Sequence, residues 1–202
     1  MKCEDYRAKM TPADFDAIPV DEDNPLDEYY VALIDGNKRF SGIDEEYPQG
    51  YEDIELIKQL TKGQQLLILL GVFDGQVKNG GITQFFWNYP GYIFAVRDAI
   101  EYLGETRLLK NYEKALEKLA GEKKQWFKLR EECYKTKGQP SWETFQQSYG
   151  LLELSWFDDS YFDETGYDST GQWTKLKRGL HLPFQMRLVE YIKSHKDEFI
   201  KE

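Results

Sequence analysis

The segment "VKNGGITQFFWNYPG", residues 77–91, decides the fold of this chain. It places two adjacent glycines shortly before three large aromatic residues, Phe85, Phe86 and Trp87. Because glycine adopts positive φ at little cost, the pair can form a tight turn that leads into a core helix, or a backbone concavity beneath a binding pocket. The first alternative makes the segment part of the scaffold, and the second makes it a site.

The composition is that of a folded protein. The 202 residues are 41% hydrophobic and 15% aromatic, which is too rich in large apolar side chains for a disordered chain and sufficient for one domain with a proper core. No apolar run reaches the length of a membrane helix, and the first residues lack the apolar segment of a signal peptide, so we expect a cytoplasmic protein. Cys3 and Cys133 match no metal-ligand spacing and are expected to be ordinary thiols.

Negative charge is concentrated in two stretches of the chain. The net charge is −10, and residues 1–55 contain 16 Asp or Glu against 5 Lys or Arg. Residues 153–168 carry six further acids and no base. Both stretches would repel the phosphates of a nucleic acid, so we do not expect nucleic acid to bind directly.

Apolar residues recur at helical spacing along most of the chain. Gly36, Gly104 and Gly121 are expected to end helices, Ser141 to cap the start of one, and Pro183 to lie in the first turn of the last. The predicted helices cover residues 26–35, 52–78, 93–103, 106–120, 126–134, 142–149 and 184–199.

The fold class follows from these helices. A buried strand at 66–73 is the alternative for one apolar run, but no partner strand is evident elsewhere in the sequence. We therefore predict an all-α protein with six or seven helices. Residues 1–25, which contain three prolines, are predicted to be a partly ordered acidic N-terminal arm, and residues 26–202 a single compact helical domain.

The sequence offers little to catalysis. His181 is expected in a connecting loop, and His195 is expected to pack on a helix between Tyr191 and Phe199, its neighbours at i−4 and i+4. No phosphate-binding glycine loop, nucleophile motif or His/Cys metal spacing is present, so neither an enzyme nor a cofactor is predicted.

The carboxylates of residues 158–168 form the best candidate for a chemical site. They could bind Ca²⁺ or Mg²⁺, or supply a pair of groups for acid–base catalysis, although their order does not match an EF-hand loop. A solvated acidic loop and an acidic surface that faces a protein partner are the other two interpretations. The acids concerned are Asp158, Asp159, Asp163, Glu164 and Asp168.

The opening segment, extended to residue 116, resembles the signature of a bacterial family named for a DNA-mimic protein and formerly catalogued as a domain of unknown function. The similarity covers roughly residues 26–202 in the expected order. It implies that the Asn-Gly-Gly sequence is an inter-helix turn and that the aromatic residues after it enter the core. The residues that carry the resemblance are Asn79, Gly80, Gly81, Gln84, Phe85, Phe86, Asn88 and Gly91, with Tyr191, His195 and Phe199 in the closing helix.

The resemblance also implies a function. A DNA mimic arranges surface carboxylates like duplex phosphates and competes with DNA for a basic protein, often as a dimer, so a basic DNA-binding protein is the expected partner and a homodimer the expected assembly. The acids that could serve are Asp21, Glu22, Asp23, Asp27, Glu28, Asp44, Glu45 and Glu46, with those of residues 158–168.

Two other functions remain open at this stage. Acidic, aromatic-rich small domains also suit an immunity-type or other inhibitory protein that binds an enzyme. A metal-dependent hydrolase built on Asp158, Asp159 and Asp163 is the third hypothesis.

Overall fold

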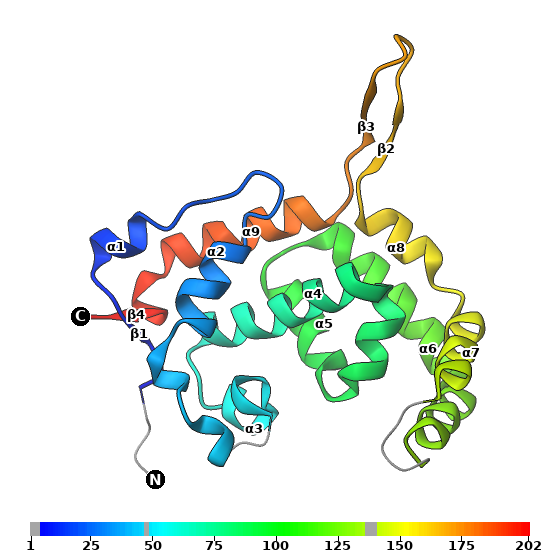
Figure 1. Ribbon diagram of the computed structural model, residues 1–202, viewed down its shortest axis with the longest axis horizontal. Coiled ribbons are helices and arrows are strands. Elements are labelled where there is room, and N and C mark those ends of the chain that lie inside the picture. The colour runs from blue at the N-terminus through cyan, green and yellow to red at the C-terminus, as the bar shows by residue number, and fades with distance from the viewer. Residues whose placement is uncertain (1–4, 47–48, 136–140) are drawn as a thin grey trace. The chain divides into compact units, whose positions relative to one another are not determined.

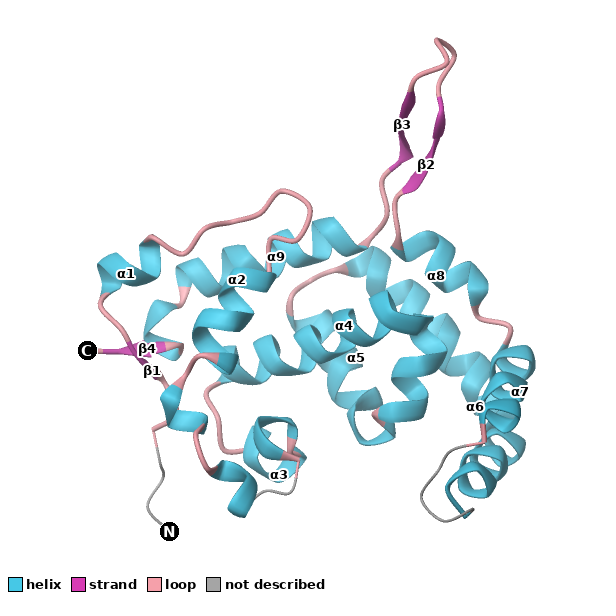
Figure 2. Cartoon of the chain, in the orientation of Figure 1, coloured by secondary structure: helices cyan, strands magenta, loops and turns pink. Residues whose placement is uncertain are grey.

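The computed structural model describes residues 5–46, 49–135 and 141–202, and the prediction made for Cys3 lies outside them. The described residues form helices and two small two-stranded sheets (Figures 1 and 2). The all-α prediction is therefore confirmed. The α-helices are α1 (Pro12–Asp16), α2 (Asp27–Tyr30), α3 (Ile54–Ile57), α4 (Lys62–Asn88), α5 (Ile93–Tyr102), α6 (Thr106–Lys135), α7 (Trp142–Leu152), α8 (Ser155–Tyr161) and α9 (His181–Ser194). The strands are β1 (Ala8–Lys9), β2 (Glu164–Tyr167), β3 (Trp173–Lys177) and β4 (Ile200–Lys201).

Short turns of other helix types complete the description. A π-helical turn, Val31–Asp35, continues α2 directly, so the predicted helix over 26–35 is confirmed, with Gly36 as its C-cap. Turns of 3₁₀-helix lie at Lys38–Phe40, Ile43–Glu45, Gly50–Glu52, Pro90–Tyr92 and Lys196–Glu198.

By its internal contacts the chain divides into two compact units. Unit 1 comprises residues 1–74, 94–105 and 181–202. Unit 2 comprises residues 75–93 and 106–180. Helices α4 and α5 each contribute residues to both units.

Unit 1 includes the N-terminal segment. Strand β1 pairs in parallel with β4, Ala8 opposite Ile200. The backbone carbonyl of Tyr6 accepts hydrogen bonds from the side-chain amides of Asn37 and Gln64, both at 2.8 Å. Phe15 of α1 is fully buried. The acidic N-terminal arm is therefore not confirmed, because apolar side chains within residues 5–25 are part of the core of unit 1.

Unit 2 is built on the aromatic residues of the opening segment. Trp87 is 1% exposed and makes edge-to-face contacts with Trp126 of α6 and Phe145 of α7, with ring centroids 5.6 Å and 5.3 Å apart. Phe86 meets Tyr112 of α6 in the same way at 6.0 Å. Helices α6 and α7, which carry these partners, lie side by side (Figure 1). Edge-to-face pairs add to the stabilisation from apolar burial.

Helix α4 is kinked at the Gly80–Gly81 pair. Gly81 has φ +78°, a left-handed conformation that an L side chain adopts only with strain. The kink frees backbone groups that a straight helix would pair internally, and two side chains satisfy them. The Tyr149 hydroxyl donates to the Gly80 carbonyl, and the Ile82 N–H donates to Oδ1 of Asp158 at 2.9 Å. The aromatic residues then follow the kink, as the scaffold alternative requires.

Two sequence predictions of helix boundaries are wrong. Gly121 does not end a helix, because α6 runs continuously through it; Gly121 is exposed, and the buried stripe continues from Leu119 to Trp126, two turns further on. The helix predicted for 52–78 is interrupted after Ile57, since Thr61 caps a new helix by accepting from the Gln64 N–H at 3.2 Å. The apolar run 66–73 is helical, so the strand alternative is also wrong.

Three further differences lie in the C-terminal part of the chain. The prediction of no strands missed the β2–β3 hairpin, which is short and exposed and so lacks the buried alternation of a core strand. His181 is the first residue of α9 rather than a loop residue. Helix α9 ends at Ser194, so His195 and Phe199 lie beyond it instead of on its apolar stripe.

The predicted cap at Ser141, which accepts from the Thr144 N–H, is confirmed.

A substitution at the kink tests how strongly the fold depends on it. We expect Gly81→Ala to lower the free energy of unfolding by about 2 kcal/mol or more, because the residue is held at positive φ and the added Cβ would lie 2.3 Å from Oδ2 of Asp158. Urea unfolding followed by circular dichroism measures the change.

Gly75→Ala in the same helix is the matched control. Nothing lies within 4 Å of its added Cβ, and its backbone is helical, so we expect this variant to be as stable as the wild type or more stable by roughly 0.5–1 kcal/mol. Equal stability of the two variants would contradict the role assigned to the kink.

Candidate partner-binding surfaces

The first group of candidate acids lies in unit 1 at the start of α2. Asp21 forms a local turn, in which its Oδ1 accepts from the N–H groups of Asp23, at 2.9 Å, and Asn24, at 2.7 Å. Asp27 and Glu28 occupy the first turn of α2, where negative charge is favoured by the helix dipole. All the acids of this group are exposed: Asp21, Glu22, Asp23, Asp27 and Glu28.

The second group of unit 1 lies in and just after the turn Ile43–Glu45. Glu45 and Glu46 are exposed. The side chain of Asp44 is outside the described part of the structure. This group therefore contributes two described carboxylates to the surface of unit 1.

In unit 2, Asp158 is a structural residue of the kink rather than a surface acid. It lies on α8, and its carboxylate contacts the backbone of α4 at Gly81 and Ile82. The pKa of Asp158 is raised from 3.8 to about 6, mainly because of burial; the hydrogen bond from the Ile82 N–H acts in the opposite direction, and the negative charge of Asp159 makes a smaller contribution that raises the pKa. The neighbouring Tyr149 hydroxyl has its pKa raised to about 12 by burial and by the charge of Asp158.

Asp163 and Asp168 hold the β2–β3 hairpin. At its base, Asp163 Oδ1 accepts from the Gly179 N–H at 2.7 Å, and Oδ2 pairs with Lys175 at 3.1 Å; the side chain is only 9% exposed. At its tip, Asp168 Oδ1 accepts from the backbone N–H groups of Thr170 and Gln172 and from the Thr170 hydroxyl. These hydrogen bonds lower the pKa of Asp168.

The two other acids of the patch, Asp159 and Glu164, are exposed. The carboxylates of residues 158–168 are thus distributed over a helix, the base of a hairpin and its tip, and they do not converge. Within residues 5–46, 49–135 and 141–202 no three His, Cys, Asp or Glu side chains are placed to hold a metal ion. The geometry offers no support for the metal-hydrolase hypothesis.

The hairpin itself is a surface feature that was not predicted from the sequence. It extends from the end of α8 (Figure 1), and Tyr167 and Trp173 face each other across it with ring centroids 5.0 Å apart. Tyr167, Trp173 and Leu176 are 70%, 64% and 51% exposed. The signal that could have revealed it is the turn sequence Asp168–Gly171 between strand-forming residues, with Gly171 at positive φ.

The residues that carry the family resemblance are mostly structural in their contacts. Phe85 and Phe86 are fully buried, whereas Asn79 and Gly91 are exposed. Gln84 and Asn88 both donate their side-chain amides to Oε1 of Gln76, at 3.1 Å and 2.7 Å. These two amides join the segments before and after the kink of α4.

The C-terminal signature residues belong to unit 1. The Tyr191 hydroxyl donates to Oε1 of Glu198 at 3.0 Å, and its ring stacks on His195 with centroids 4.1 Å apart. The other carboxylate oxygen of Glu198 accepts from the Gly63 N–H in the first turn of α4, where Phe199 is also packed and 1% exposed. These residues therefore fix the end of the chain against the start of α4.

Comparison with known proteins identifies the family. The family model described as DMP19-like protein, where DMP19 denotes DNA mimic protein 19, matches residues 58–195. The chain belongs to the DMP19-like family. The match includes the kink of α4 and the acids of residues 158–168, and it excludes the acids of residues 21–28 and 44–46. Neither the curated proteins nor the solved structures provided a match.

None of the helices in the described ranges combines the length and the apolar character that crossing a membrane requires.

The raised pKa of Asp158 predicts a pH dependence of stability. Because its pKa is higher in the folded protein than its ordinary value, folding favours the protonated carboxyl, and this stabilisation is complete below about pH 4 and lost as the pH rises through 6. We expect the free energy of unfolding of the wild type to fall between pH 4 and 7 relative to that of Asp158→Asn, which retains an acceptor for the Ile82 N–H but cannot ionise.

Denaturant unfolding at a series of pH values measures this difference. Glu164→Gln, at an exposed acid of the same patch, serves as the control and should follow the wild type. Parallel curves for the wild type and Asp158→Asn would refute the assignment.

Proposed function

We propose that this protein is a non-enzymatic interaction protein of the DNA-mimic type, which occupies the basic surface of a DNA-binding protein through its own carboxylates. The observation that supports this most is the row of exposed acids at residues 21–28 in a chain of the DMP19-like family. The proposal places the protein in the cytoplasm, where such partners meet DNA, and includes a homodimer, which would present two such rows.

Charge density is the physical basis of the proposal. Duplex DNA presents one negative charge per about 1.7 Å of its axis, so a competitor must present closely spaced acids. Residues 21–28 contain five acids in eight positions. A competitor also gains affinity when its charges are already ordered, and here the Asp21 turn and the first turn of α2 fix the backbone that carries them.

The acids do not contribute equally to the proposed surface. Asp158 and Asp163 are largely covered and committed to the kink and to the base of the hairpin. Asp168 is only partly exposed, unlike Asp21, and its Oδ1 accepts three hydrogen bonds in the hairpin turn. The proposed partner-binding acids are therefore the exposed ones, namely Asp21, Glu22, Asp23, Asp27, Glu28, Glu45, Glu46, Asp159 and Glu164.

The test is capture of partners on the immobilised protein, with elution by salt and competition by duplex DNA. We expect a basic DNA-binding protein to be retained at low salt, released as exposed charges are screened, and displaced by DNA. The variant Glu22→Gln, Asp23→Asn, Asp27→Asn, Glu28→Gln should weaken binding of the purified partner by at least about tenfold, a loss of roughly 1.4 kcal/mol.

The matched control neutralises four glutamates of α6, at Glu117, Glu122, Glu131 and Glu132. It changes the net charge by the same amount and should leave the affinity within about twofold of the wild type. Equal weakening by both variants would mean that total charge, rather than the 21–28 row, attracts the partner. Failure of DNA to displace any captured protein would rule out mimicry.

A second candidate function is an inhibitory binding protein for an enzyme, and the exposed hairpin is the observation that favours it. Interfaces of this kind are commonly anchored by aromatic residues, and Tyr167 and Trp173 are both well exposed. In this case the captured partner would remain bound in excess DNA, and Tyr167→Ser with Trp173→Ser would weaken its binding by roughly 2 kcal/mol or more.

A further inference from the structure

A cavity in unit 1 collects most of the positive charge of the acidic first quarter of the chain. The cavity has a volume of about 550 Å³, within the range of small-molecule sites. The described residues that line it come from β1 and its neighbour Met10, and from the turn that follows α2: Ala8, Lys9, Met10, Ala32, Gly36, Asn37, Lys38 and Arg39.

The lining of the cavity is positively charged, whereas residues 1–55 as a whole are negatively charged. Residues 1–55 contain five basic residues, and three of them, Lys9, Lys38 and Arg39, line the cavity, while no acid is among its described lining residues. Arg7 is instead paired with Asp5 at 2.8 Å. No ion pair of Lys9, Lys38 or Arg39 is found within the described part of the chain. Grouping unpaired cations costs electrostatic free energy, which a bound anion would offset.

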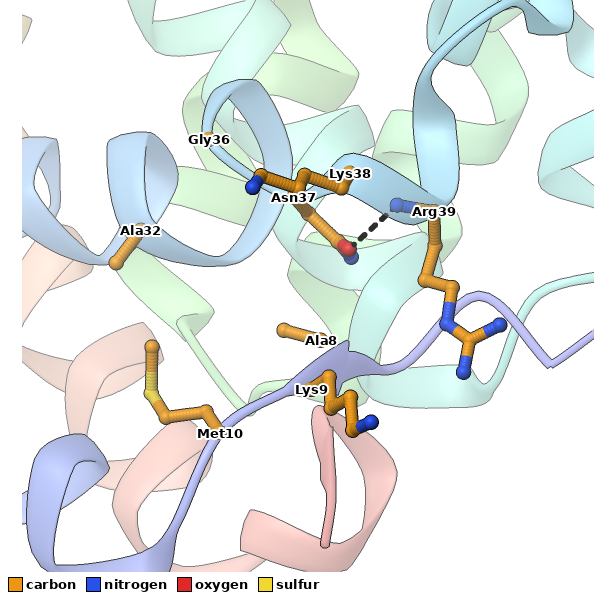
Figure 3. Close-up of a pocket in the computed structure, with 8 residues that line it drawn as sticks. All are labelled: Ala8, Lys9, Met10, Ala32, Gly36, Asn37, Lys38 and Arg39. Atoms are coloured by element: carbon orange, nitrogen blue, oxygen red, sulfur yellow. Dashed lines mark hydrogen bonds between the residues drawn. The ribbon is translucent and has the colours of Figure 1, made fainter.

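Buried hydrogen bonds and aromatic packing fix the turn that carries Lys38 and Arg39. Asn37 is 6% exposed, and its Nδ2 donates to the backbone carbonyls of Tyr6 and Leu33 while its Oδ1 accepts from the Arg39 N–H at 3.0 Å (Figure 3). Phe40 is buried and stacks on Tyr6, with ring centroids 5.4 Å apart. The backbone of the cationic wall is therefore ordered before any ligand arrives, which lowers the entropic cost of binding.

The strand beside the cavity adds backbone hydrogen-bonding groups. Pairing with β4 uses the N–H groups of Ala8 and Met10, which donate to Phe199 and Lys201. In a parallel ladder the intervening residue directs its N–H and C=O to the opposite edge, so those of Lys9 face away from β4. The Lys9 N–H, at a cavity lined by Lys9, Lys38 and Arg39, is a suitable donor for an oxyanion.

The cavity is also amphipathic. Figure 3 shows Met10 and Ala32 on one side of the lining and Arg39 with Lys9 on the other, while the side chain of Lys38 extends from the turn toward Gly36. A bare inorganic ion would leave the Met10 side in contact with water. A ligand with an apolar body joined to an anionic group would fill both sides.

We propose that this cavity is a binding site for a small phosphate monoester with an apolar body, which is a property separate from the proposed DNA mimicry. A phosphate dianion matches three cations better than a single carboxylate does, and its oxygens can accept both from the planar guanidinium of Arg39 and from the ammonium groups of Lys9 and Lys38. The apolar body lies against Met10 and Ala32.

Titration of the full-length, ¹⁵N-labelled protein with phenyl phosphate tests the proposal. We expect saturable changes in the amide resonances of Lys9, Gly36, Lys38 and Arg39. The double variant Lys38→Gln, Arg39→Gln should bind phenyl phosphate at least about tenfold more weakly, because charge-assisted hydrogen bonds are lost. Both side chains are exposed, so the variant should keep the wild-type fold by circular dichroism.

Two controls make the test specific. Lys123→Gln with Lys124→Gln removes the same charge from exposed positions of α6 and should leave phenyl phosphate binding unchanged. Met10→Gln should weaken phenyl phosphate binding while leaving binding of inorganic phosphate unaltered. Unsaturable shifts spread over exposed lysines, or equal losses in both double variants, would overturn the site. Benzoate binding as tightly as phenyl phosphate would overturn the assignment of a phosphate ligand.

Discussion

The contact between Asp158 and the kink of α4 is the interaction on which unit 2 depends. Gly81 turns the chain through a conformation reserved for glycine, and the carboxylate receives the Ile82 N–H that the kink leaves without a helical partner. Tyr149 does the same for the Gly80 carbonyl. Helices α7 and α8 each supply one of these partners, so their two hydrogen bonds fix the direction of α4 after the kink. They thereby also fix the positions of the aromatic residues that follow.

This arrangement divides the acids of the chain by role. An acid that accepts backbone hydrogen bonds in a covered position stabilises the fold, as Asp158 and Asp163 do, and cannot also present its charge freely to a partner. The acids at residues 21–28 have no comparable burial. The net charge of −10 therefore suggests more exposed negative charge than unit 2 offers to a partner. Among the described residues, most of the exposed negative charge lies on unit 1.

Much of the scaffold could be predicted from the sequence because its signals are local. Apolar spacing located most of the helices, the cap at Ser141 followed from residue type, and the burial of the aromatic residues after Gly81 was implied by the family resemblance. The predictions failed where a distant contact outweighed a local preference, or where the local signal was weak. Gly121 was expected to end a helix, yet the buried stripe on either side of it keeps α6 continuous. The exposed hairpin lacks the apolar alternation by which strands are recognised.

The sequence by itself determined the helical class, the acidic first quarter and the aromatic content of the core, since these depend on composition and on spacing within a few turns. Only the tertiary structure decided which charged side chains form hydrogen bonds and ion pairs within the fold and which are exposed to solvent. It brought Asp158 to Gly81 across 77 positions and placed Lys9, Lys38 and Arg39 in the lining of one cavity. The physical reason is that burial and charge pairing depend on distances in space, and spacing along the chain does not fix those distances.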